Sequence, residues 1–538
     1  MRRADGRIAV ALVVALSLLT LAGPLLVADI PPLTDYPNHL ARYWLIAGGV
    51  ADPRLAGFYR IDWSAAASNI GVDRLVLLLS PWASGLALGH AALVAAAVLP
   101  PAGALALNAA IFGRPTPWQA LFPIAAWSTT FLMGFLNFQT GLGLALLFAA
   151  IDPLAHPRLP RGAALARLPF GLILGADHLF ALLFYAILLA GLALGPAPLR
   201  PLDARVTSMR LARAAGAAAW CVVPLAVLGL SGRGLPGAEQ SGVGVTHGSI
   251  SLLIPGKLAT LLSALASYNL FQELILAAIL VGLVVGLMRA RALDGHRGLL
   301  LAAAGLLVLA ILAPSHAAGA SWVDKRFPIM ALLCGMAAVT TRRGLPGRTV
   351  AWLSAAALAL SAGQAAWVGW NWRAMAAPTA AVLRALQAVP PGARLLPLQH
   401  EQDTWARLTA PPGRYMFSVG DATYRHFDSL AVPLRHAFTP KLFAARGLQP
   451  LGVRGDWEAR VEHNGGDLAS VNALTRAPRS GEPSYLPGWS EHFDYVLVLN
   501  ADMADRDGPF HAPSNLTLVR DEGFAQLWRV TPPPRPVG

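Results

Sequence analysis

Apolar runs at or near membrane-spanning length fill most of the first 371 residues, and they constrain the fold more than any other feature. The first covers residues 7–28, and others follow at about 88–112, 118–134, 136–151, 168–194, 214–230, 269–288, 298–313, 327–341 and 349–371. A helix needs roughly 20 mainly apolar residues to cross a bilayer. The sequence therefore predicts a mainly α, polytopic helical membrane protein.

Charge is distributed unevenly along the chain. Residues 1–371 contain 25 Lys and Arg against 13 Asp and Glu, whereas residues 372–538 contain 17 and 16. We therefore predict a transmembrane domain at 1–371 and a soluble domain at 372–538. The excess of basic residues fits the cytoplasmic loops of a membrane protein and does not indicate a nucleic-acid partner.

Basic flanking residues set the predicted topology. Arg2 and Arg3 precede the first run and Arg7 begins it, and these basic residues place the N-terminus in the cytoplasm. The run at 168–194 has arginines on both sides, so we expect it to cross out and back, turning at Asp177-His178; one span is the alternative. This gives about 11 spans, with residues 372–538 outside. Arg outnumbers Lys 39 to 3, which suggests a bacterial genome. We expect a bacterial plasma (inner) membrane protein with a periplasmic C-terminal domain.

The predicted outer segments contain amphipathic patterns. In loop 29–70 we expect one helix from Pro37 to Gly48 and another from about Pro53 to Ser68, both lying along the membrane surface. A third interfacial helix is expected at 257–268. Residues 372–538 give strand signals at 393–399, 495–499, 516–519 and 524–530 and helix signals at 378–389 and 436–447. These signals predict a small extracytoplasmic α/β domain.

The segment DYPNH at 35–39 follows the first apolar run. Asp35 and His39 are four residues apart and share a helix face, and Arg42 continues near that face. A carboxylate at a membrane surface suits a general base. The alternative is that Asp35 caps the helix that begins near Pro37. We take Asp35 as the candidate catalytic residue and His39 and Arg42 as candidate substrate-binding residues.

Two further groups of polar residues lie beside apolar runs. Asp177 and His178 interrupt one run, and ionisable residues in such places usually face a cavity; a polar pair that joins helices is the alternative. Lys325 and Arg326 lie at an outer boundary, where the charge rule disfavours cations. They suit a phosphate or diphosphate, or they anchor the interface. With His316, all of these residues are candidate substrate-binding residues.

Several motifs are absent from the sequence: a Gly-rich phosphate loop, a GxSxG elbow and an HExxH zinc motif. His400, Glu401 and Asp403 are close in sequence, but carboxylates near a histidine are common by chance, and no metal is predicted from them. The two cysteines, Cys221 and Cys334, lie in apolar runs and offer no disulfide framework.

The order of these features resembles the GT-C superfamily of membrane glycosyltransferases: a first span, an outer loop that opens with Asp35, interfacial helices, many short spans and a terminal outer domain. The entry into a late span at Asp324-Lys325-Arg326-Phe327 is similar to that of some members. The family often has a second acid next to the first, whereas Asp35 is followed by Tyr36. The metal requirement is therefore unknown, and a divalent metal remains an open alternative.

The resemblance implies an inverting transfer of a sugar from a polyprenyl-phosphate donor to an acceptor on the outer face of the membrane. Asp35 would deprotonate the acceptor hydroxyl, and Lys325 and Arg326 would offset charge on the leaving lipid phosphate. The partners would be this donor and membrane lipid. A transporter or flippase for a lipid-linked or amphiphilic substrate, and a non-catalytic membrane assembly protein, are the alternative functions.

Overall fold

The computed structural model describes residues 2–155, 159–197, 204–231, 253–265, 268–317, 320–416, 420–477 and 479–531. The chain is mainly helical and forms two compact units. Unit 1 comprises Met1–Val27, Ala66–Val72 and Ala92–Trp370, and unit 2 comprises Ala28–Ala65, Asp73–Ala91 and Asn371–Gly538. Unit 2 therefore combines most of the predicted outer loop 29–70 with the C-terminal region.

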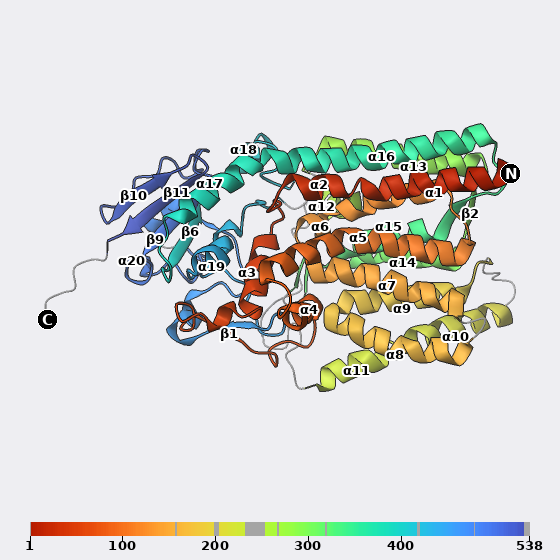
Figure 1. The fold of residues 1–538 in the computed structure, drawn as a ribbon, viewed down its shortest axis with the longest axis horizontal. Coiled ribbons are helices and arrows are strands. Elements are labelled where there is room, and N and C mark those ends of the chain that lie inside the picture. The colour runs from red at the N-terminus through yellow and green to blue at the C-terminus, as the bar shows by residue number, and fades with distance from the viewer. Residues whose placement is uncertain are drawn as a thin grey trace. The chain divides into compact units, whose positions relative to one another are not determined.

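Unit 1 is built from long helices that run alongside one another (Figure 1). Helix α9 packs against α7 and α14, and α14 packs against α15. The helices of this unit, of which α5 and α16 also extend into unit 2, are α1 Arg2–Leu19, α2 Ala22–Val27, α5 Gly85–Phe112, α6 Thr129–Leu132, α7 Leu136–Ala155, α8 Pro160–Asp177, α9 Leu179–Leu194, α10 Ala204–Ala219, α11 Val222–Leu230, α12 Leu253–Leu262, α13 Leu270–Arg289, α14 Arg297–Leu312, α15 Arg326–Ala338 and α16 Gly347–Ala374.

Six helical segments among the described residues are long and apolar enough to cross a membrane: Arg7–Val27, Gly85–Phe112, Leu136–Ala155, Arg205–Leu230, Leu270–Arg289 and Gly347–Gln387. Shorter apolar helices include Leu179–Leu194, Arg297–Leu312 and Arg326–Ala338. These lengths and compositions indicate a membrane protein. The apolar run at 118–134 differs from the others, because it forms the buried 3₁₀ helix Pro117–Trp127 followed by α6.

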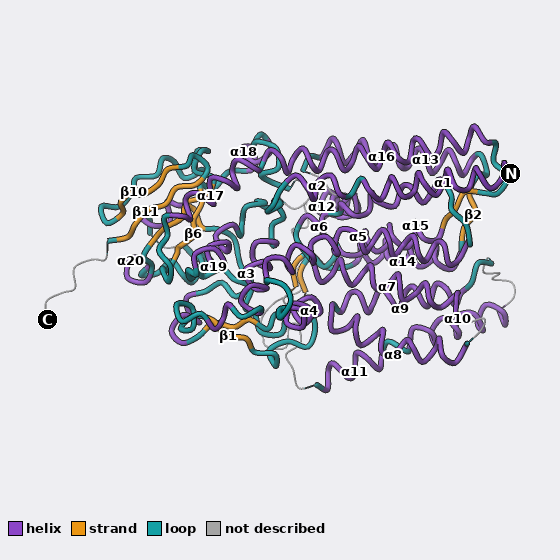
Figure 2. The backbone as a smooth tube through the Cα atoms, in the orientation of Figure 1, coloured by secondary structure: helices purple, strands orange, loops and turns teal. Residues whose placement is uncertain are grey.

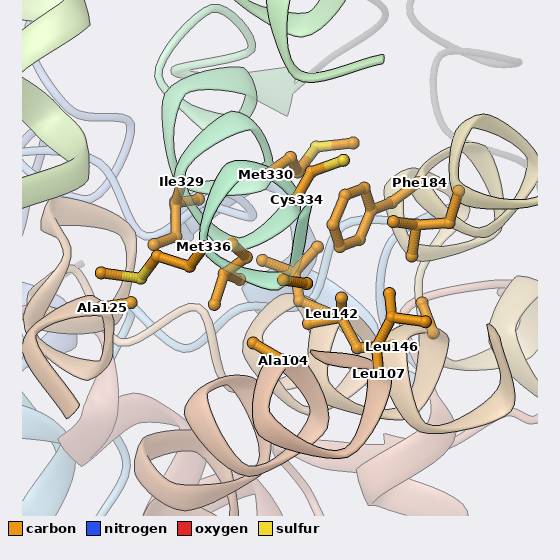
Figure 3. Packing of buried hydrophobic residues seen from close by; sticks show 14 of the residues in the cluster. Ala104, Leu107, Ala125, Leu142, Leu146, Phe184, Ile329, Met330, Cys334 and Met336 are labelled. Carbon is orange, nitrogen blue, oxygen red and sulfur yellow. The ribbon is translucent and has the colours of Figure 1, made fainter. Parts of the chain in front are cut away.

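The core of unit 1 lies where α5, α7, α9 and α15 meet, and Figure 3 shows Leu107, Leu142, Phe184 and Met330 packed there. Small residues let helices approach closely. A Cβ atom on Gly298 would lie 2.1 Å from the carbonyl oxygen of Gly191, so α9 and α14 require glycine at this crossing.

The helical backbone is interrupted between α8 and α9, at the position where the sequence predicted a turn. Helix α8 ends at Asp177, and His178 has extended backbone angles (φ −164°, ψ 131°). The His178 ring accepts a hydrogen bond from the Phe180 N–H through Nδ1, at 3.1 Å, and so caps α9. A polar residue at this position satisfies a backbone donor that the break exposes.

Unit 2 contains a five-stranded mixed sheet in the order β10–β11–β9–β6–β8 (Figure 2). Strand β6 is parallel to β9 and β8, whereas β11 is antiparallel to β9 and β10. The strands are β6 Leu395–Gln399, β8 Ala469–Ser470, β9 Tyr495–Leu499, β10 Leu516–Asp521 and β11 Ala525–Val530. Four of them, β6, β9, β10 and β11, lie where the sequence predicted strands. Continuous apolar runs such as β9 are typical of strands covered on both faces.

The N-terminal part of unit 2 is joined to its C-terminal part by a strand pair. Strand β1 (Tyr59–Ile61) pairs antiparallel with β7 (Leu451–Val453). Buried Leu45 and Tyr59 belong to the same apolar cluster as residues of the sheet. The helices are α3 Tyr36–Ile46, α4 Gly71–Leu79 (which begins in unit 1), α17 Ala376–Gln387, α18 Thr404–Leu408, α19 Ala431–Arg435 and α20 Trp489–His492.

Two predicted helices of unit 2 are wrong. The region 53–68 forms turns and β1, because the backbone of residues 59–61 pairs with β7 and the side chains of Leu55 and Tyr59 enter the shared core. The region 436–447 is not helical, because α19 ends at Arg435, the next residue, His436, is left-handed (φ 52°), and Pro440 follows. The helix predicted at 37–48 is present as α3. The helix expected at 257–268 begins earlier, as α12, and residues 266–267 lie outside the described chain.

Candidate functional site

Asp35 directly precedes α3 and is 9% exposed. Its backbone is already helical (φ −93°, ψ −10°), and its carbonyl accepts a hydrogen bond from the His39 N–H at 3.0 Å. No capping hydrogen bond to the Asp35 side chain is found within the described chain. The carboxylate is thus held at the start of α3 without the capping role that was the alternative prediction.

His426 approaches this carboxylate from a distant part of the chain. Its Nε2 lies 3.7 Å from Asp35 Oδ1, and its side chain is 1% exposed. Burial lowers the pKa of His426 well below its usual value, and nearby Lys441 and Arg425 lower it further. The imidazole is therefore neutral. Phe443 packs edge-on against the ring, at 5.1 Å between centroids.

Arg425, the preceding residue, carries a partly buried guanidinium, with a side chain that is 20% exposed. It donates to Asp421 Oδ1 at 2.8 Å and also to Asp467. Burial opposes its charge, but Asp421, Asp467 and Asp35 outweigh this effect, and the pKa of Arg425 is raised. Arg425 therefore links Asp35 electrostatically to a second group of carboxylates.

The amine of Lys441 is buried next to the backbone of Arg425. The Lys441 side chain is fully buried, and its Nζ donates to the carbonyl oxygen of Arg425 at 3.1 Å. Burial lowers the pKa of Lys441 to about 8, partly offset by the Asp428 charge. Burial also raises the pKa of Asp428, which accepts a hydrogen bond from the Thr439 hydroxyl. Lys441 and Asp428 thus partly compensate each other inside the unit.

Asn38 fixes α3 to the segment that carries Lys441. The Asn38 amide donates to the carbonyl oxygen of Lys441 at 2.8 Å and accepts from the Phe443 N–H at 3.0 Å. Both contacts are made by one fully buried side chain. This pair of hydrogen bonds sets the position of α3, and with it the position of Asp35.

The two other predicted residues of α3 have different surroundings. The His39 ring stacks on Tyr43 and lies against Phe443, with ring centroids 6.0 and 5.7 Å away. Arg42 is fully buried and pairs with Asp73 of α4 at 2.7 Å. The geometry thus gives Arg42 a structural partner, and its predicted substrate-binding role remains a prediction.

The remaining candidates lie in unit 1. Asp177 is buried and accepts a hydrogen bond from the Thr140 hydroxyl at 3.2 Å. Arg326 Nη1 lies 2.8 Å from His178 Nε2, which brings together two residues that the sequence placed in separate groups. The Arg326 guanidinium lies over the rings of three phenylalanines, Phe135, Phe138 and Phe180.

Lys325 and its neighbours form a buried charged group. Lys325 is 6% exposed, and its Nζ lies 5.3 Å from the centroid of the Trp322 ring. Asp324 pairs with Lys257 at 2.9 Å, so the Asp324 charge is compensated by α12. His316 lies in the short strand β3 (His316–Ala317), which pairs with β4 (Ala320–Ser321), and its ring centroid lies 5.8 Å from that of Trp322.

The candidate residues thus divide between the units: Asp35, His39 and Arg42 belong to unit 2, and Asp177, His178, His316, Lys325 and Arg326 to unit 1. Sequence reasoning missed Arg425, His426 and Lys441. The only signal for the first two was a pair of adjacent basic side chains, which is common in soluble domains. They are recognised only because the fold carries them to α3.

Among the described residues, no three His, Cys, Asp or Glu side chains gather closely enough to hold a metal ion. The His426 imidazole lies beside Asp35, and the neighbouring Arg425 is a cation, which does not ligate metals. Comparison with protein-family models, with curated proteins and with solved structures finds no match to this chain.

Proposed function

We propose that the chain is an integral membrane glycosyltransferase, which transfers a sugar from a polyprenyl-phosphate donor to an acceptor hydroxyl on the outer face of the bacterial plasma membrane. In this proposal the chain crosses the membrane about 11 times, and residues 372–538 form a periplasmic α/β domain. The observation that carries the proposal is Asp35, a nearly buried carboxylate at the start of α3 that lies beside the neutral imidazole of His426.

The proposed reaction needs a base and a leaving group. Asp35 accepts the proton of the acceptor hydroxyl group. The oxygen of that hydroxyl group attacks the anomeric carbon of the donor at the same time. The bond from that carbon to the lipid phosphate breaks, and the electron pair leaves with the phosphate. In a second part of the proposal, Lys325 and Arg326 of unit 1 would offset the phosphate charge. This part can be tested independently of the role of Asp35.

A reconstitution assay tests the proposal. Purified protein in liposomes receives a radiolabelled polyprenyl-phosphate sugar, and release of the label from lipid is measured. Asp35→Asn should lower turnover by roughly 10²–10⁴-fold, because it removes the base but keeps the shape. Asp62→Asn is the matched control, since its carboxylate accepts from the Ser64 N–H and hydroxyl in a local turn. Label that crosses the bilayer uncleaved would instead indicate a flippase.

Topology is tested separately with reporter fusions. Alkaline phosphatase fused after Gly538 should be active, and a cytoplasmic fluorescent reporter at the same position should not. A fusion at Pro196 examines the proposed return at Asp177-His178, where the phosphatase should be inactive. An active phosphatase at Pro196 would leave one crossing between residues 168 and 194.

A further inference from the structure

A small polar pocket lies in unit 2 at the carboxyl end of strand β6. The pocket includes Gln399, the last residue of β6, and Leu468, which precedes the parallel strand β8. Ligands of parallel sheets commonly bind beyond the carboxyl ends of the strands. Its wall includes Arg425, which is adjacent in sequence to His426, the neighbour of Asp35.

The charged groups of this pocket nearly balance. Three carboxylates line it, on Glu401, Asp421 and Asp467, together with the guanidinium groups of Arg407 and Arg425. A third guanidinium, that of Arg506, lies 2.9 Å from Glu401 Oε1. A ligand with a net charge would disturb this balance, so the pocket favours a neutral ligand that offers both donors and acceptors.

Asp421 gives independent support for a ligand. It is only 8% exposed, and its Oδ1 accepts from Arg425 at 2.8 Å. Its second oxygen, Oδ2, is buried and has no hydrogen-bond partner among the residues that the structure describes. Burial raises the pKa of Asp421 and also that of Glu401. Such an oxygen is costly unless a donor reaches it, and a ligand hydroxyl group is a suitable donor.

The size of the pocket narrows the class of ligand. Its volume is about 60 Å³, room for roughly five water-sized groups on the scale where one water needs about 10–15 Å³. Two or three hydroxyl groups and the ring edge that carries them would fill this space. A lipid chain would not suit it, because seven of the ten lining side chains are polar or charged.

We propose that this pocket binds a neutral polyhydroxylated ligand of the monosaccharide class. Neighbouring hydroxyl groups donate to Asp421 and Asp467 and accept from Arg407, while the Tyr415 ring borders the ligand. The binding itself does not depend on any catalytic activity. We add that this ligand is the acceptor of the sugar, and this addition rests on the proposed function. Arg425 lines the pocket, and the next residue, His426, contacts Asp35.

Binding is tested on the full-length protein in detergent by saturation-transfer difference NMR, with D-mannose, D-galactose and myo-inositol as neutral probes. D-glucuronate and D-glucosamine serve as charged probes and should bind more weakly. At least one neutral probe should give a saturable signal. Asp421→Asn should weaken it about five- to ten-fold, because a neutral hydrogen bond replaces a charge-assisted one. The matched control is the exposed residue Asp456, and Asp456→Asn should leave binding unchanged.

A second variant protects the test against misfolding of Asp421→Asn. Ala422→Leu adds an apolar side chain to the pocket wall and should abolish the signal while the melting temperature stays near that of the wild type. The absence of a saturable signal from every neutral probe would overturn the proposal. Wild-type binding by both Asp421→Asn and Ala422→Leu would also overturn it.

The same variants separate this proposal from the proposed function. Asp35→Asn should retain probe binding while losing sugar transfer. Binding without transfer from any donor would leave the pocket in place and remove the transferase. Transfer that depends on Asp35 but not on the pocket variants would leave the transferase and remove the pocket as its acceptor site.

Discussion

Replacing Arg42 with methionine should destabilise unit 2 strongly. The Arg42 and Asp73 side chains are both 0% exposed, and two hydrogen bonds join them, at 2.7 and 3.3 Å. Arg42→Met keeps most of the side-chain volume but leaves the Asp73 carboxylate buried without its counter-ion. Removing one partner of a buried pair costs about 3–5 kcal/mol.

Removing both charges should have a much smaller effect. Arg42 Nη1 is buried and has no hydrogen-bond partner among the described residues, so burial of the guanidinium carries a desolvation cost. In the double variant Arg42→Met/Asp73→Leu, this cost disappears together with the attraction. Replacing a buried pair by apolar residues is often neutral or stabilising. We expect the double variant to melt within a few degrees of the wild type.

The assay is the melting temperature of the purified protein in detergent, followed by tryptophan fluorescence. For a unit of roughly 200 residues, 3–5 kcal/mol corresponds to a decrease of about 6–20 °C. The half-exposed pair of Arg342 and Asp294 provides the control, and Arg342→Met should cost less than about 1 kcal/mol. The reasoning fails if Arg42→Met melts like the wild type, or if the double variant is as unstable as the single one. A stable double variant that loses donor or acceptor binding would instead support the substrate-binding prediction for Arg42.

Three further outcomes can be checked by the same melting assay. Asn38→Ala removes both hydrogen bonds to the segment 441–443 and should cost about 2–4 kcal/mol, whereas wild-type stability would show that these bonds do not hold α3. Because the pKa of His426 is lowered by burial, the unfolded chain binds an extra proton below about pH 6.5, and stability should fall by up to about 1.4 kcal/mol per pH unit as the pH decreases; His426→Phe should flatten this slope. Gly71→Ala would place a Cβ atom 2.2 Å from Asp177 Oδ1 and should lower the melting temperature by several degrees. An unchanged melting temperature would show that the backbone at the α8–α9 break shifts without cost.

Local patterns in the sequence predicted many elements of the fold. The membrane-length helices follow from apolar runs, because any such run must hydrogen-bond its own backbone in a bilayer. The break at Asp177-His178 followed from two polar residues in an apolar run with arginines on both sides. Strands β6 and β9 were visible as short apolar runs bounded by turn residues. The two wrong helices, at 53–68 and 436–447, were amphipathic segments whose partner was a distant strand or core.

The candidate site was predictable only in part. Asp35 and His39 could be placed on one helix face from their spacing, since helix geometry is local. The neighbours of Asp35 could not be found in this way, because His426 lies almost four hundred residues further along the chain. No periodic pattern relates two such positions.

The sequence by itself determined a membrane-type chain with a charged C-terminal region and a carboxylate just after the first span, because hydropathy, charge and helical spacing act over a few residues. The tertiary structure alone decided that the segment 28–65 joins the C-terminal region in one unit, through β1 pairing with β7 and the Asn38 contacts. It also decided that Arg42 forms a buried ion pair with Asp73, that His426 contacts Asp35 and that Arg425 interacts electrostatically with Asp35. Those contacts depend on which distant surfaces exclude water together, which no local pattern encodes.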